Sequence, residues 1–360
     1  MMTHLWLSEA FPVDGTPLFR RSFSYADDAR ELVARAQAYE RRGAAREATV
    51  AYDMVLALID GAPAGPFHAD VLRWKGTLLR ELGFTTRADA LYRRSLAIAQ
   101  NIGYTLGIAH AQHCLATIHQ RRGQLPQATE LYRDATANAL AAGDQRLATM
   151  IGQNLAVLAT ILGDVDGAWE RYRASLGAFR AAGDDEGTIW TLYHLGVLAT
   201  HTDHAAEAEA AFDEGLALAR TRGDVFLEGL LVLGRAELLI RTGRLEDGEN
   251  ECERALVVAD QRGDRLRRAE ALRLRAMIDQ QRCDLDRATR SLTEAEELAL
   301  EGEDARLVAD VLREAGQVWL RRGDIGHARA TWEQAMSIFR TIGATPDIRD
   351  LERRLSTLAH

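Results

Sequence analysis

The sequence predicts an all-α solenoid built from about eight copies of one helix-turn-helix unit, and three observations support this. A turn residue returns every forty positions, as at Gly83 and Gly123. A second glycine series, which includes Gly103, falls half a unit later and leaves two segments of helical length in each unit. Each second segment places a ring four residues after a small residue, as in Ala128 and Tyr132. Self-similarity at a fixed period is the signature of stacked repeats.

The turn positions indicate where each helix ends. Glycine just past a helix end accepts the left-handed conformation that other residues resist. Asp203 and Cys283 stand where the period places a glycine, and Gly302 comes one residue early in the second series. An aspartate after a turn glycine is expected to cap the next helix by accepting its free amide protons. These aspartates are Asp144, Asp184, Asp224 and Asp264.

Small residues recur at one position in each helix of the unit and predict close helix packing. In the first helices they are Ala36, Gly76, Ala116, Ala156, Gly196, Ala236, Ala276 and Gly316. In the second helices they are Ala48, Ala88, Ala128, Ala168, Ala208, Gly248, Ala288 and Ala328. Six of the second helices then carry a ring four residues on, at Tyr52, Tyr92, Tyr132, Tyr172, Phe212 and Trp332. Enlarging a small site is expected to cost about 1–3 kcal/mol.

These residues resemble the tetratricopeptide repeat, whose signature includes Leu-Gly in the first helix and Ala-x3-Phe in the second. Leu195-Gly196 matches the first element, and Ala208-x3-Phe212 matches the second. The period is forty rather than about 34 residues, and glycine replaces the closing proline. The longer unit is similar to the repeats of bacterial regulators of the Rap and MalT types. The resemblance covers about 320 residues and implies a right-handed α-solenoid superhelix.

The repeat register divides the chain into three parts. Residues 1–24 form an N-terminal extension, residues 25–344 hold eight repeats, and residues 345–360 form a C-terminal capping helix. The extension contains Trp6, Phe11, Phe19 and Phe23, so we expect it to cover the apolar face of the first repeat. A regulatory arm or a dimer contact is the other interpretation.

Composition restricts the class of function. The formal charge of −9 argues against a nucleic-acid-binding surface, which would need a basic patch. Three scattered cysteines indicate a reducing compartment rather than a disulfide framework. No apolar run is long enough for a membrane helix, and no signal-like segment precedes the repeats. We therefore expect a cytoplasmic protein without a membrane or a direct nucleic-acid partner.

The resemblance implies that the first helices line a concave groove that receives peptides or protein segments. Counting from the small residue of each first helix gives the candidate groove residues His110, His113, Gln153, Asn154, Trp190, Tyr193, His194, Arg273 and Arg313. The middle of this groove is aromatic and rich in histidine, while its C-terminal part is charged. Neither His110 and His113 nor His201 and His204 have further donors at a metal-ligand spacing, so we expect no metal or cofactor.

The sequence carries no phosphate-binding, nucleophile-elbow or zinc-protease motif. We therefore expect a non-enzymatic scaffold that binds a protein or peptide in its groove. An alternative is a signalling or transcription-type regulator whose groove senses a small peptide or metabolite. A further alternative is an assembly scaffold that uses its convex face or its ends. The remaining alternative is an enzyme that uses the groove histidines. The oligomeric state is left open.

Overall fold

The computed structural model describes residues 25–358, and the expectation for residues 1–24 therefore lies outside the described residues. Within the described range the chain forms α-helices joined by short turns, without strands. The helices are α1 (Tyr25–Arg41), α2 (Ala45–Leu58), α3 (Pro66–Glu81), α4 (Thr85–Asn101), α5 (Thr105–Arg121), α6 (Leu125–Ala141), α7 (Gln145–Leu162), α8 (Val165–Ala182), α9 (Asp185–His201), α10 (Ala205–Arg222), α11 (Val225–Arg241), α12 (Leu245–Arg262), α13 (Arg265–Gln281), α14 (Leu285–Glu301), α15 (Ala305–Arg321), α16 (Ile325–Thr341) and α17 (Thr345–Thr357).

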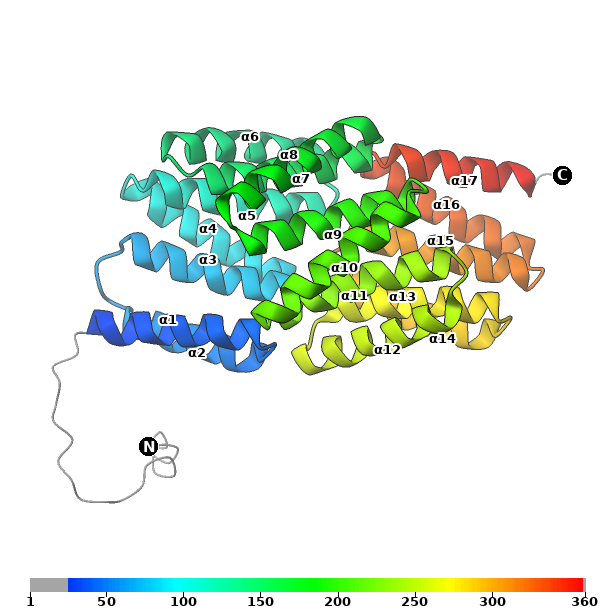
Figure 1. The fold of residues 1–360 in the computed structure, drawn as a ribbon, viewed down its shortest axis with the longest axis horizontal. Coiled ribbons are helices and arrows are strands. Elements are labelled where there is room, and N and C mark those ends of the chain that lie inside the picture. Colours follow the sequence, from blue (N-terminus) through cyan, green and yellow to red (C-terminus); the bar gives the residue numbers. More distant parts are fainter. Residues whose placement is uncertain (1–24, 359–360) are drawn as a thin grey trace, which may run out of the picture.

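The helices are arranged in two layers of a superhelix (Figure 1). Each odd-numbered helix packs against the even-numbered helix that follows it, and the odd-numbered helices from α3 to α15 also contact one another in succession. This continuous contact makes the odd-numbered helices the inner layer, and the even-numbered helices cover them from outside. The predicted all-α solenoid of helix-turn-helix units is confirmed.

The turn register is conserved even where glycine is missing. Asp203 and Cys283 adopt left-handed φ angles of 59° and 63°, as their place in the period predicts. The expectation for Gly302 is wrong: Glu303 is the left-handed residue, with φ 55°, and Gly302 stays in the helical region. A Cβ on Gly302 would lie 2.5 Å from Leu266 Cδ2, so this glycine serves close packing rather than the turn.

The expected helix caps are also present. Asp144, Asp184, Asp224 and Asp264 each accept the backbone N–H three residues later. Four further aspartates that the sequence analysis did not single out cap helices in the same way, at Asp164, Asp284, Asp304 and Asp324. Each cap satisfies an amide that the first helical turn leaves without a partner, and it contributes about 1 kcal/mol.

The small positions allow the rings to enter between the two helices of a unit. A Cβ on Gly76 would lie 2.7 Å from Tyr92 Cε1, and one on Gly196 would lie 2.5 Å from Phe212 Cε1. These rings are fully buried, as is Tyr132 beside Ala116. The spacing of small and large residues therefore reports helix packing, as expected.

The two turns of the superhelix touch each other, a feature that the repeat pattern does not predict. The turns inside the first four repeats lie against the beginnings of helices four to five repeats later, and we call this line of contacts the seam. Its glycine contacts are Gly43 with Val225, Gly83 with Arg265, Gly123 with Ala305, and Gly163 with Thr345. Each contact moves forward by one unit on both sides, so a superhelical turn takes about four and a half repeats.

Specific polar contacts close the seam. Thr85 Oγ1 donates to the Gly302 carbonyl oxygen at 2.6 Å, and Thr86 bonds to the Glu303 carboxylate. Arg122 Nε bonds to the same carboxylate at 2.7 Å. Further along, Arg262 Nη1 donates to the Glu40 carbonyl oxygen at 3.3 Å. These bonds join helices that are more than 180 residues apart in the sequence.

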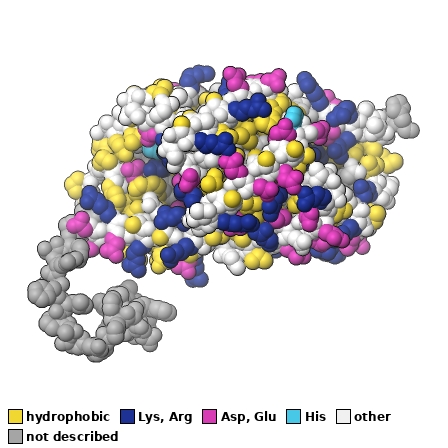
Figure 2. Space-filling model, in the orientation of Figure 1, with side chains coloured by type: hydrophobic (Ala, Val, Ile, Leu, Met, Phe, Trp, Pro, Cys, Tyr) yellow, Lys and Arg dark blue, Asp and Glu magenta, His cyan; other side chains and the backbone are white. Residues whose placement is uncertain are grey.

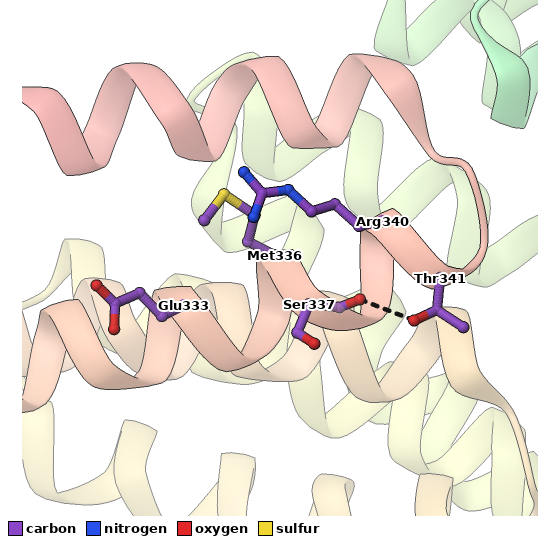
Figure 3. A pocket seen from close by; sticks show the side chains of 5 residues that line it. All are labelled: Glu333, Met336, Ser337, Arg340 and Thr341. Atoms are coloured by element: carbon purple, nitrogen blue, oxygen red, sulfur yellow. Dashed lines mark hydrogen bonds between the residues drawn. The ribbon is translucent and has the colours of Figure 1, made fainter.

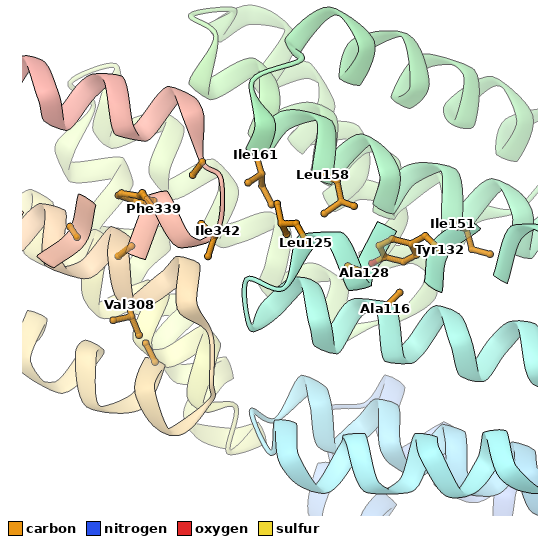
Figure 4. Close-up of a cluster of buried hydrophobic side chains, with 14 of the residues drawn as sticks. Ala116, Leu125, Ala128, Tyr132, Ile151, Leu158, Ile161, Val308, Phe339 and Ile342 are labelled. Atoms are coloured by element: carbon orange, nitrogen blue, oxygen red, sulfur yellow. The ribbon is translucent and has the colours of Figure 1, made fainter. Parts of the chain in front are cut away.

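An apolar cluster extends across the seam as well. Figure 4 shows Ile342, from the connection between α16 and α17, facing Leu125 of α6 and Ile161 of α7. All three side chains belong to one buried cluster that also contains Tyr132 and Phe339. The third and fourth repeats are therefore held to the last repeat by a shared core.

Candidate functional site

The inner layer carries the predicted groove residues, and it divides into two sections of different chemistry. The first, here called the histidine section, comprises the inner faces of α5, α7 and α9. The second, called the ion-pair section, comprises the inner faces of α11, α13, α15 and α17. Both sections use the same register positions of the repeat.

His113 and Asn154 form the link between α5 and α7. Asn154 Nδ2 donates to His113 Nε2 at 2.7 Å and also to the Met150 carbonyl oxygen at 3.3 Å. Because an amide nitrogen only donates, the imidazole accepts at Nε2 and is neutral. Burial, together with the nearby His110, Arg80 and Arg73, lowers the pKa of His113 to about 3. The sequence placed these two residues in one groove, and the structure brings them into direct contact.

Gln153 lies between α7 and α9 rather than free in the groove. Its amide nitrogen donates to the Gly187 carbonyl oxygen at 3.3 Å and to the Thr191 hydroxyl. The side chain is buried, with 5 % of its surface exposed. Both amide protons are used, so Gln153 fixes the spacing of two inner helices.

A group of aromatic rings occupies the inner face of α9. His194 stacks between Tyr172 and Trp190, with ring centroids 5.6 and 5.9 Å apart. Tyr193 lies 5.1 Å from His194, and Phe226 of α11 lies 6.0 Å from Trp190. Burial lowers the pKa of His194 to about 4, so this ring is also neutral at physiological pH.

The histidine section retains polar groups without partners. Within residues 25–358, the His110 ring and the Trp190 indole N–H form no hydrogen bond. Next to this section, on α3, the buried Nε of Arg73 has no hydrogen-bond partner in that range, although Arg73 Nη2 pairs with Asp70 Oδ1 at 3.2 Å. Burial lowers the pKa of His110 to about 3, with Arg73 and Arg146 contributing. Buried nitrogens without a hydrogen-bond partner among the described residues also occur in the ion-pair section, at Arg273 Nε and Arg306 Nη1, so what distinguishes the histidine section is its neutral rings.

In the ion-pair section, the charged side chains pair with one another. Arg273 Nη2 donates to Glu237 Oε2 at 2.8 Å, and Arg313 Nη1 donates to Asp347 Oδ1 at 2.7 Å. Glu237 is also 3.0 Å from Arg241. Burial alone would raise the pKa of Glu237, but Arg273, His201 and Arg241 hold it well below its usual range.

Arg273 and Arg313 were predicted as groove residues, and the structure places both on the inner face but buried. Only 5 % of Arg273 and 8 % of Arg313 is exposed. Breaking such a pair leaves an uncompensated buried charge, which is strongly unfavourable. Both arginines therefore hold neighbouring inner helices together in this structure.

A separate shallow depression of about 650 Å³ lies on the outer layer at α16. Figure 3 shows its lining residues, Glu333, Met336, Ser337, Arg340 and Thr341, all on α16. Arg340 pairs with Glu352 of α17 at 3.3 Å, and Thr341 Oγ1 donates to the Ser337 carbonyl oxygen at 3.0 Å. Because these polar groups are paired locally and come from one helix, they do not converge on a common point.

Charges of both signs are interspersed over the face shown in Figure 2. In the part of the chain that the structure describes, no three His, Cys, Asp or Glu side chains are grouped as metal ligands. Among the described helices, none has both the length and the apolar character that a membrane span requires.

Sequence comparison recognises the repeats directly. A tetratricopeptide-repeat family model matches residues 67–141, which cover α3 to α6. No curated protein sequence matches the chain. The match therefore identifies tetratricopeptide repeats in α3 to α6, and the helices that follow continue the same two-layer architecture.

Among solved structures of this class, the fold is similar to that of Rap proteins. A Rap protein complexed with Competence and Sporulation Factor has 12 % identity and a TM-score of 0.58, over 92 % of this chain and 98 % of that one. The Rap conjugation gene regulator of the plasmid pLS20, in complex with the Phr* peptide, has 16 % identity and a TM-score of 0.64, over 83 % and 81 %.

A third similar structure comes from a larger protein. It is a signal transduction ATPase with a tetratricopeptide repeat sensor, from Pyrococcus horikoshii. Its identity is 14 % and its TM-score is 0.51, over 94 % of this chain and 54 % of that one. These similarities confirm the predicted resemblance to Rap-type repeat regulators at the level of the fold.

Proposed function

We propose that this chain is a non-catalytic regulatory scaffold that binds a peptide or protein segment on its histidine section. The observation that carries the proposal is a pair of side chains on α5 and α9, His110 and Trp190, whose ring nitrogens form no hydrogen bond within residues 25–358. The buried Nε of Arg73, next to this section on α3, also has no hydrogen-bond partner in this range. The two Rap structures of similar fold contain a bound factor or peptide, which supports a peptide as the ligand.

Each residue of the histidine section has a role in this proposal. Trp190 and Tyr193 are the apolar anchors, since aromatic residues provide most of the binding energy at interfaces. His110 and the Trp190 indole N–H hydrogen-bond the peptide backbone. Asn154 and His113 hold the floor between α5 and α7, and His194 fixes the orientation of the Trp190 ring. Arg273 and Arg313 keep the following inner helices in place.

Neutral imidazoles favour this kind of ligand. A neutral ring offers one donor and one acceptor, which matches the alternating groups of a peptide backbone. Burial keeps His110 and His194 neutral at physiological pH, so the section does not repel a cationic peptide through these two rings. The bound segment would bury apolar surface against the α9 rings, and that burial would supply most of the affinity.

The test is a paired affinity capture followed by direct binding. One bait is the wild-type chain, and the second carries Asn154→Ala, Trp190→Ala and Tyr193→Ala. A third, matched bait carries Arg94→Ala, Glu130→Ala and Glu214→Ala on the outer helices. Thermal unfolding checks that all three baits are folded.

Synthetic peptides that tile a protein captured by the wild type are then titrated by fluorescence anisotropy. We expect one peptide to bind the wild type and the outer-face variant equally. It should bind the inner-face variant at least about 30-fold more weakly, because an anchor residue contributes about 2 kcal/mol or more. Equal affinity for all three chains would reject the proposal and would favour the convex face or the ends.

The seam favours a second candidate, a sensor whose ligand changes the spacing of the superhelical turns. The second and third repeats contact the seventh directly, so a ligand between the inner helices would also act on these contacts. A disulfide between Thr86→Cys and Glu303→Cys would lock the seam, since the two side chains are in contact. A sensor should then lose ligand-dependent changes in its X-ray scattering radius, whereas a rigid scaffold shows none in either form.

A further inference from the structure

An apolar stripe on α2 is the most unusual surface of the first repeat. Val50, Met54 and Leu58 follow one another at intervals of four residues, so they share one helix face. Their exposed fractions are 53 %, 52 % and 36 %. The opposite face of α2 is occupied by Ala48, Tyr52 and other residues buried against α1 and α3.

The register of the repeat shows that this stripe is specific to α2. In the other seven second helices, the residues equivalent to Val50 and Met54 are polar, charged or alanine. The equivalent pairs are Ala90 and Arg94, Glu130 and Asp134, Glu170 and Ala174, Ala210 and Glu214, Asn250 and Arg254, Arg290 and Glu294, and Ala330 and Gln334. The outer face of a second helix is thus normally built for water, and α2 departs from this rule at two consecutive positions.

We propose that residues 1–24 of this chain dock on the α2 stripe formed by Val50, Met54 and Leu58. This segment contains Trp6, Phe11, Phe19 and Phe23, which is an unusual number of large apolar rings for a short stretch. Burial of such rings against exposed aliphatic side chains is favourable, since it removes apolar surface of both partners from water.

The segment is joined to the fold close enough to the α2 stripe to dock on it. Residues 1–24 lead directly into α1, and α1 and α2 form a helical hairpin, so Leu58 at the end of α2 lies near the beginning of α1. A helix of 14 residues is about 21 Å long. An extended chain of 24 residues spans up to about 80 Å. The segment is therefore long enough to follow the whole stripe.

A second copy of the chain is a weaker candidate for the same face. A stable interface between proteins buries about 800 Å² on each partner. Three side chains on one helix provide only a fraction of this area. The other large exposed apolar residues lie on different helices, such as Leu140 on α6 and Val257 on α12, and they do not extend the stripe.

Limited digestion with trypsin tests the proposal, because Arg20 and Arg21 are cleavage sites inside the segment. The test variant carries Val50→Glu and Met54→Arg. The matched control carries Ala330→Glu and Gln334→Arg, which makes the same charges at the equivalent positions of α16. Circular dichroism confirms that both variants are folded.

We expect cleavage at Arg20 and Arg21 to be at least about tenfold faster in the α2 variant than in the wild type, because proteolysis follows the population of the undocked state. The α16 control should be cleaved at the wild-type rate. Equal rates in all three chains would overturn the proposal. A wild-type rate that rises on dilution would also overturn it, since protection would then come from a second copy.

A second measurement follows the stripe itself. Met54→Cys is introduced together with Cys283→Gly, which removes the exposed cysteine and restores the turn glycine. Replacing Trp6, Phe11, Phe19 and Phe23 by serine should raise the alkylation rate of the new thiol severalfold, as mapped by mass spectrometry. The same replacements should not change alkylation of Gln334→Cys. An unchanged rate at position 54 would contradict docking even if the digestion results agreed with it.

Discussion

The histidine section and the ion-pair section lie at equivalent positions of successive repeats, yet their side chains interact in different ways. In the first, neutral imidazoles, an amide and aromatic rings leave hydrogen-bonding groups unused, as His110 and Trp190 show. In the second, Arg273 and Arg313 form ion pairs with carboxylates of neighbouring helices.

The difference shows how one repeat scaffold can carry two inner surfaces of different chemistry. The backbone of the unit is conserved along the chain, so the inner positions are free to vary in chemistry. Where these positions carry complementary charges, they bind each other and stiffen the inner layer. Where they carry neutral polar and aromatic groups, they remain available to a ligand.

The largest expected effect is a difference in unfolding free energy between variants of the two sections. Arg273→Met leaves Glu237 buried without its main partner, and it should lower the free energy of unfolding by about 3 kcal/mol. Asn154→Ala removes one neutral hydrogen bond from the histidine section and should cost about 1 kcal/mol. Urea unfolding followed by circular dichroism measures both values.

The double variant Glu237→Leu, Arg273→Met is the control for this comparison. It removes both charges and should recover most of the stability that Arg273→Met loses. If the single variant were as stable as Asn154→Ala, the ion-pair section would not be a structural support, and the contrast between the sections would fail.

The close packing of Gly302 on Leu266 lies next to the seam, because Leu266 also lies against Gly83. Gly302→Ala places a Cβ 2.5 Å from Leu266 Cδ2 and should destabilise the fold by about 1–3 kcal/mol. The backbone of Gly302 is helical, so the cost would arise from packing and not from backbone strain.

Gly177→Ala is the matched substitution in α8, where a Cβ would meet no atom within 4 Å. It should stabilise the chain by about 0.5–1 kcal/mol, because alanine is the better helix former. Thermal melts of both variants give the comparison. Two stabilised variants would mean that the close approach at Gly302 is not maintained in solution.

An effect that is confined to acidic pH is expected from His194. His194 has a folded-state pKa of about 4, below the ordinary value near 6.5. Its contribution to stability is therefore present above pH 6.5 and is lost as pH falls toward 4, by about 1.4 kcal/mol per pH unit. His194→Phe keeps a ring between Tyr172 and Trp190 and should make the unfolding free energy less sensitive to acid by that amount.

Unfolding titrations between pH 7.5 and 4.5 would check this prediction. Substitution of the exposed residue His204 by glutamine gives the baseline for a histidine outside the inner layer. An unchanged acid sensitivity in His194→Phe would show that this ring is hydrated in solution, and the histidine section would then be more open than the structure indicates.

The local architecture was predictable from the sequence because most repeats have the same helix ends and the same packing of a ring against a small residue. The turn at Asp203 and the caps at Asp144 and Asp184 follow from the backbone needs of a helix end, which a forty-residue pattern reports well. The rings packed on Gly76 and Gly196 follow from the same pattern. The inner positions of His113 and Asn154 were also predictable from register.

The seam and its consequences were not predictable in this way. The pitch of a superhelix is the sum of small rotations at every repeat, and no single repeat encodes it. Contacts between neighbouring helices were missed as well: Leu266 packs on Gly302, which was predicted in a turn, and Glu237 binds Arg273, which was predicted in an open groove. Only the assembled structure shows that Thr85 donates a hydrogen bond to the Gly302 carbonyl oxygen and that Arg273 pairs with Glu237.

The seam also changes how the chain should fold and unfold. In an open solenoid each unit touches only its neighbours, so terminal units fray and partly unfolded chains are populated. Here Thr85 with Gly302, and Arg262 with Glu40, connect units far apart in the chain. Loss of a terminal unit therefore exposes a unit in the middle as well. This coupling makes the array closer to a globular domain, with one cooperative transition and a slower approach to the native state, because distant segments must meet before the seam forms.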